Sequence, residues 1–76
     1  MAITWEQIEA RKRRLERLSR GLMKEAVIVD EHDDLFLRVE RLAYLKALRD
    51  AIAGLETARV VLAHATQRVA REGRQG

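Results

Sequence analysis

The stretch LFLRVERLAYLKALRDAIAGLETARVVLAHATQRVARE, residues 35–72, decides the fold of this chain. It contains no proline and a single glycine, Gly54, so it can form one helix about 57 Å long at 1.5 Å per residue. A compact fold of 76 residues has a radius of gyration of about 11 Å. The residues before the stretch are too few to bury so long a helix. The sequence therefore predicts either a kinked helix or one covered by another chain.

The composition predicts a single domain over residues 1–76 with a small core. Hydrophobic residues make up 47% and charged residues 36%, which is typical of a folded, soluble helical protein rather than a disordered one. The chain has no cysteine, so neither a disulfide nor a thiolate metal site can stabilise that core. Because packing must stabilise it alone, the composition favours association with another chain.

No targeting or membrane segment is expected. The opening residues lead directly into a charged amphipathic stretch, unlike a signal peptide. No apolar run approaches the roughly 20 residues that cross a bilayer. We therefore expect a cytoplasmic protein with no membrane partner.

The net charge of +3 is unevenly distributed along the chain. Residues 1–24 carry a balance of +4, residues 25–40 a balance of −5, and residues 41–76 a balance of +4. An acidic middle between two basic ends is typical of two antiparallel helices joined by an acidic turn. The same pattern allows head-to-tail attraction between chains, so the high pI is a weak argument for nucleic acid.

Thr4 and Gln7 mark the beginning of a helix expected over residues 4–25. The Thr4 hydroxyl can accept a hydrogen bond from the first turn, and Gln7 has the spacing of a capping box. Ile3 and Ile8 are placed for a hydrophobic staple across the same turn. The apolar stripe of this helix is expected to consist of Trp5, Ile8, Leu15, Leu18, Leu22 and Met23.

The connector is expected at residues 27–34. The β-branched run at 27–29 should end the first helix, and Asp30, Asp33 and Asp34 are candidate N-caps for the second. In the alternative, residues 26–30 and 35–39 are two strands, giving an α+β helix–β-hairpin–helix fold. The turn between those strands would lack the glycine or asparagine that hairpins favour, so helices are preferred.

The opening Ala2-Ile3-Thr4-Trp5-Glu6-Gln7, followed by a basic-apolar helix, a connector and a second helix, resembles small head-completion proteins of tailed phages. Those proteins have a helix–hairpin–helix layout and join the capsid to the tail. The resemblance therefore implies a small virion joining protein. The glycine-containing turn of those proteins is missing from this sequence.

The helix expected at 35–72 has two parts. Residues 35–48 are apolar on several sides, which one helix of the same chain cannot cover. Residues 48–69 carry an apolar seam beside a row of small residues, where another helix could approach closely. A basic tail at 73–76 should follow a helix stop at Gly73. The expected self-association or partner interface consists of Leu35, Phe36, Leu42, Leu45, Leu48, Ala51, Ile52, Gly54, Leu55, Ala58, Leu62 and Val69.

A ridge of four cations forms a second candidate site. It consists of Arg13, Arg17, Arg20 and Lys24, which fall on one side of the first helix. The ridge could be a solvated face, dock an acidic protein or follow phosphates. No aromatic residues alternate with the cations for base stacking, so nucleic acid is the less favoured partner.

No catalytic, metal or cofactor site is expected. His32 lies among four acidic residues, but the spacing matches no metal or calcium-loop pattern. The only serine, Ser19, is expected in the middle of a helix, and no glycine-rich loop follows a strand.

The sequence as a whole predicts an all-α antiparallel helical hairpin that dimerises into a four-helix bundle. The expected function is a non-enzymatic interaction module, an adaptor or regulator that presents a helical surface to a protein partner. The alternative is a nucleic-acid-binding accessory protein that uses the basic ridge.

Overall fold

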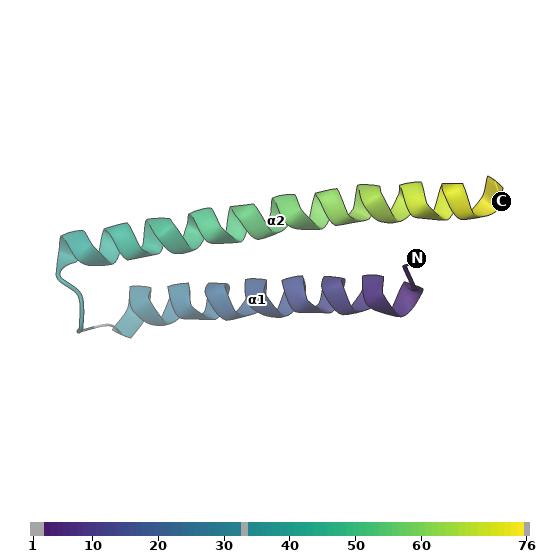
Figure 1. Cartoon of the computed structure of the whole chain (residues 1–76). Coiled ribbons are helices and arrows are strands. Elements are labelled where there is room, and N and C mark those ends of the chain that lie inside the picture. The colour runs from purple at the N-terminus through teal and green to yellow at the C-terminus, as the bar shows by residue number, and fades with distance from the viewer. Residues whose placement is uncertain (1–2, 33, 76) are drawn as a thin grey trace.

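The computed structural model describes residues 3–32 and 34–75, which form two helices packed side by side. The helices α1 (Trp5–His32) and α2 (Arg38–Gln75) run antiparallel, and both ends of the chain lie at the same end of the hairpin (Figure 1). The prediction of an all-α helical hairpin is confirmed. The described residues form no strand, so the α+β alternative and the β-hairpin implied by the phage resemblance are wrong.

The beginning of α1 has the predicted capping box. The Gln7 amide donates to Thr4 Oγ1 over 3.2 Å, and the Thr4 amide donates to Gln7 Oε1 over 3.0 Å. These two reciprocal bonds satisfy amide groups that have no partner within the helix. Ile3 and Ile8 line the same small hollow, as the staple requires. Residues 3–8 therefore fix where the first helix starts.

The end of α1 was predicted incorrectly. The helix does not stop near residue 25 but continues to His32, so most of the expected connector at 27–34 is helical. Val29, in the β-branched run expected to break the helix, is only 1% exposed. The helical cost of a β-branched residue is below about 1 kcal/mol, whereas burying its side chain contributes about 1.5 to 3 kcal/mol. Packing therefore overrides the local preference.

The beginning of α2 also differs from the prediction. The helix starts at Arg38 rather than at 35, and Asp30, a proposed N-cap, lies inside α1. Asp33, another proposed cap, lies outside the described residues. The amide of Leu37 instead donates to Glu40 Oε1 over 2.9 Å. The cap of α2 thus comes from its own first turn, as in the second half of a capping box.

The end of α2 lies beyond the predicted stop. The helix passes through Gly73 to Gln75, so the expected fray at 73–76 is helical as far as it is described. A glycine stop uses a positive φ, and no described glycine has one. Gly73 is therefore an interior helix residue.

The core of the hairpin is small and lies mainly toward the turn. Val29, Leu45 and Leu48 are buried together, and Leu22, Ala26, Phe36 and Tyr44 pack around them. The molecule is a rod of 58 × 17 × 17 Å with a radius of gyration of 17.4 Å. A compact chain of this length would have a radius of about 11 Å. The long second helix is therefore covered by its own chain along one side only.

Candidate protein-interaction surface

One face of the hairpin carries a continuous apolar groove between the two helices. It consists of two adjoining hollows whose residues follow one another at helical spacing on both α1 and α2. Arg11, Arg14 and Arg17 flank it along α1. The residues that line the apolar groove include Leu15, Leu18, Gly21, Ala51, Gly54, Ala58 and Val61.

Two glycines, one from each helix, leave open space in the apolar groove. Gly21 of α1 and Gly54 of α2 line the same hollow, and a Cβ atom added to either would meet no atom within 4 Å beyond its chain neighbours and the nearby backbone of its own helix. The space above each glycine is therefore not needed for packing within the hairpin. Each glycine costs roughly 1 kcal/mol relative to alanine inside a helix. No contact within the hairpin uses the space that each glycine leaves, so packing inside the hairpin does not offset this loss of helix stability.

The opposite face of the hairpin is charged. Its hollow is lined by residues of both signs, including Glu16 and Arg59. Lys12 Nζ lies 3.4 Å from Glu9 Oε1, and Arg59 Nη1 lies 3.1 Å from Glu56 Oε2. This face resembles a solvated helix surface.

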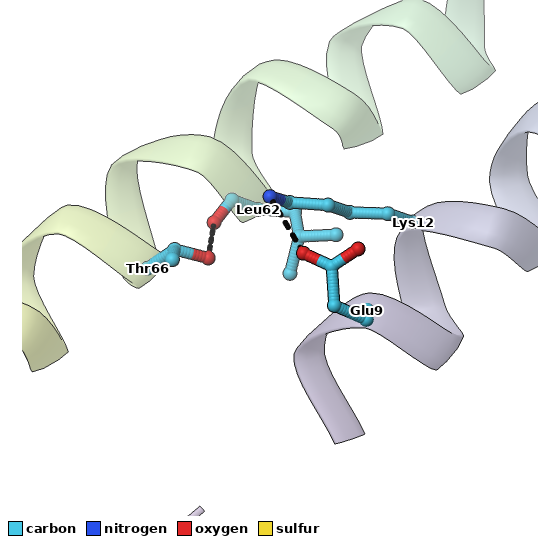
Figure 2. Close-up of polar contacts among 4 residues, drawn as sticks. All are labelled: Glu9, Lys12, Leu62 and Thr66. Atoms are coloured by element: carbon cyan, nitrogen blue, oxygen red, sulfur yellow. Dashed lines mark hydrogen bonds and ion pairs between the residues drawn. The ribbon is translucent and has the colours of Figure 1, made fainter. Parts of the chain in front are cut away.

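Lys12 and Thr66 are polar residues that lie near the contact between the two helices, beside the charged hollow. The Lys12 side chain is half-buried and reaches from α1 toward Leu62 on α2 (Figure 2). Its stem covers apolar surface while the ammonium meets Glu9, as expected for a snorkelling lysine. The Thr66 hydroxyl donates to the Leu62 carbonyl over 2.7 Å within α2. Neither polar group therefore interrupts the packing.

Many large apolar side chains are exposed in the hairpin. Leu35, Leu37 and Val39, around the beginning of α2, are 80%, 74% and 77% exposed. The prediction that one helix cannot cover residues 35–48 agrees with these exposures. A surface of this kind marks a partner interface. The other exposed large apolar residues include Ile3, Trp5, Leu18, Met23, Val27, Ile28, Leu42, Val60 and Val61.

The structure divides the predicted interface residues into three groups. Leu45 and Leu48 are buried inside the hairpin, and Phe36 packs against them. Four more, Ile52, Leu55, Leu62 and Val69, are half-buried. The remaining five face outward or line the apolar groove: Leu35, Leu42, Ala51, Gly54 and Ala58.

The contribution of α1 to this surface was missed by the sequence reasoning. Leu18 was assigned to the apolar stripe that packs inward, yet it is 51% exposed and lines the groove. Gly21 was not assigned to any surface. Each helix has a glycine in its interior, and this feature is visible in the sequence. It indicates a groove only when the hairpin register is known, because the register brings the two glycines together.

The basic ridge is exposed as predicted. Arg13, Arg17, Arg20 and Lys24 are all on the solvent side of α1. Glu9, one turn before Arg13, lies against Lys12. The ridge is thus available to an acidic partner or a phosphate backbone.

The aromatic residues Tyr44 and Trp5 lie in different environments. The Tyr44 ring lies 4.8 Å from that of Phe36, and its hydroxyl donates to Glu25 Oε2 over 3.2 Å. Tyr44 therefore joins the two helices. Trp5 is 62% exposed, with Lys12 Nζ 5.3 Å from its ring centroid. It is a surface residue in the hairpin.

The described residues offer no group of three or more histidine, cysteine or acidic side chains that could hold a metal ion. The side chain of His32, weighed above as a ligand, lies outside the described part of the structure. Neither helix, over the residues described, is long and apolar enough to cross a membrane.

Comparison of the chain with protein-family models, curated proteins and solved structures finds no match.

Proposed function

We propose that this chain is a non-enzymatic helical interaction module that associates with itself and presents a helical surface to a protein partner. The hairpin is the folding unit, and the self-associated form is a four-helix bundle. Its role is that of an adaptor or regulator. The apolar groove and the exposed residues around the turn are the surfaces that act in it.

The exposed area of the hairpin carries this proposal. The chain exposes 6535 Å². A folded monomer of 8.8 kDa exposes about 4,800 Å² according to the scaling of area with mass. The hairpin therefore has about 1,700 Å² more surface than a compact protein of its size. That excess is about twice the roughly 800 Å² that each partner of a standard interface removes from water.

The small core supports the same conclusion. Among the described residues, the buried large apolar side chains are Ile8, Val29, Leu45 and Leu48. Burying each contributes about 1.5 to 3 kcal/mol, which is small against the entropy lost on ordering two long helices. A partner that covers the exposed leucines and valines would supply the missing stabilisation.

Light scattering coupled to size exclusion, over a hundredfold range of concentration, tests self-association. We expect a mass of twice 8.8 kDa or more that falls on dilution. A folded monomer at every concentration would contradict the proposal. Circular dichroism of the same fractions shows whether the chain is folded.

The exposed basic ridge favours a second candidate function, nucleic-acid binding. Titration with DNA and with RNA at two salt concentrations tests it, because binding through phosphates weakens steeply with salt. The double variant Arg13→Glu/Arg17→Glu should then abolish binding, whereas Arg49→Glu on α2 serves as the matched control. Binding that is absent, or insensitive to the ridge variant, would exclude this candidate.

A further inference from the structure

We propose that the apolar groove is covered by the same groove of a second copy of this chain, with the two hairpins antiparallel. The turn of each copy then lies over the open end of the other, where the chain begins and ends. The twofold axis passes at the level of Gly54. This inference rests on the proposed self-association and specifies its geometry.

The charge distribution selects the antiparallel arrangement. The segment around the turn, residues 25–40, carries −5, whereas the flanking segments each carry +4. At the level of Gly54 the hairpin divides into a turn half, residues 20–53, with six cations and seven acids, and an open half with nine cations and five acids. The turn half therefore carries −1 and the open half +4, and two hairpins with turns at opposite ends set the −1 half of each copy on the +4 half of the other. Turns at the same end would set like charges together, which is unfavourable.

The groove side of α2 is self-complementary about Gly54. Glu40, Ala47, Gly54, Val61 and Arg68 follow one another at heptad spacing, so they lie along one line of the helix. In a twofold interface, residue i contacts residue j, and j contacts i. An axis at Gly54 sets Glu40 against Arg68 of the second copy. It also sets the exposed Val61 against Ala47, a large residue against a small one.

The groove side of α1 is also self-complementary about the twofold axis at the level of Gly54. Leu18, Gly21 and Gly54 line one hollow, so the midpoint between Leu18 and Gly21 lies at the level of Gly54. The axis sets the exposed Leu18 over Gly21 of the second copy, where a glycine leaves room for it. It also sets Arg14 against Glu25. Size and charge therefore match in a single register on both helices.

The shared face is large enough for a stable dimer. The helix α1 is about 42 Å long at 1.5 Å per residue. With a hairpin width of 17 Å, the shared face covers roughly 700 Å² on each copy. A standard interface removes about 800 Å² per partner from water. The remaining exposed residues around the turn, among them Leu35 and Leu37, stay available to another partner.

The variant Gly54→Leu tests the position of the axis. The hairpin has space for the new side chain, because a Cβ atom at Gly54 meets nothing within 4 Å, so the helix content should be retained. At the axis, two leucines would meet and force the copies apart. We expect the dissociation constant to rise at least tenfold. Ala53→Leu, an exposed position directly before it, is the matched control and should leave the dissociation constant unchanged. Unchanged affinity in Gly54→Leu would overturn the inference.

Spin-label distances test the antiparallel orientation. The chain has no cysteine, so Asp34→Cys introduces a single labelling site beside the turn. With the turns at opposite ends, the two labels should be more than about 40 Å apart, roughly the length of α1. With the turns at the same end, the separation would be close to the 17 Å width of one hairpin. A dimer with the short distance overturns this inference alone, whereas a monomer overturns the proposed self-association as well.

Discussion

Val29 is the most buried side chain in the described part of the chain, and its environment explains where α1 ends. It packs against Leu45 and Leu48 of α2, close to the turn. Its neighbour Val27 has the same β-branched side chain but is 54% exposed on another side of the helix. Val27 and Val29 have the same intrinsic helix preference but differ in burial, so comparing them isolates the effect of burial on stability.

Val29→Ala should lower the free energy of unfolding by about 2 kcal/mol, because it removes buried methyl groups from a core with few members. Val27→Ala should change it by less than about 0.5 kcal/mol, since an exposed substitution loses little packing and alanine suits a helix. Urea unfolding at one fixed protein concentration measures both. Equal effects of the two variants would show that Val29 is not part of the core.

Each helix begins with a side chain that satisfies free amide groups, but the two caps differ. At α1 the cap is reciprocal between Thr4 and Gln7. At α2 the Glu40 side chain accepts from the Leu37 amide, while the Leu37 side chain has no polar atom to return the bond. The carboxylate also lies in the first turn, where negative charge complements the helix dipole.

Glu40→Ala should destabilise the beginning of α2 by about 0.5 to 1 kcal/mol, because both the hydrogen bond and the dipole interaction are lost. Glu40→Gln keeps an acceptor oxygen and should lose only part of that amount. Amide hydrogen exchange at residues 38–41 measures the effect locally. Identical exchange in the two variants and the parent chain would contradict the assigned cap.

The whole molecule is a rod whose second helix extends past the first at the open end (Figure 1). Its radius of gyration of 17.4 Å and its exposed area of 6535 Å² both exceed those of a compact protein of this size. This excess of exposed surface supports the proposed self-association. Its stability should depend on how much of it is associated.

The melting temperature should therefore rise with protein concentration, by about 3 to 6 °C for each tenfold increase, if unfolding is coupled to dissociation. Calorimetry across a hundredfold range of concentration measures this rise. The Gly54→Leu variant is the control, since its melting temperature should respond less over the same range. A melting temperature independent of concentration in the parent chain would indicate that the hairpin is stable by itself.

The sequence alone determined the all-α hairpin and the cap at Thr4. It also determined that the first helix covers only one side of the long second helix. Each depends on local or periodic features: a capping box, the absence of proline, and apolar residues at helical spacing. Residues 35–48 carry too many apolar side chains for one neighbouring helix to cover, and this is visible without coordinates.

Only the tertiary structure decided where the connector lies and which face is the apolar groove. The helix boundary at His32 depends on the burial of Val29 against α2, a contact between residues far apart in the sequence. The groove depends on Gly21 and Gly54 lining the same hollow, which the hairpin register sets. Local preferences are worth only tenths of a kcal/mol, so long-range packing decides such features.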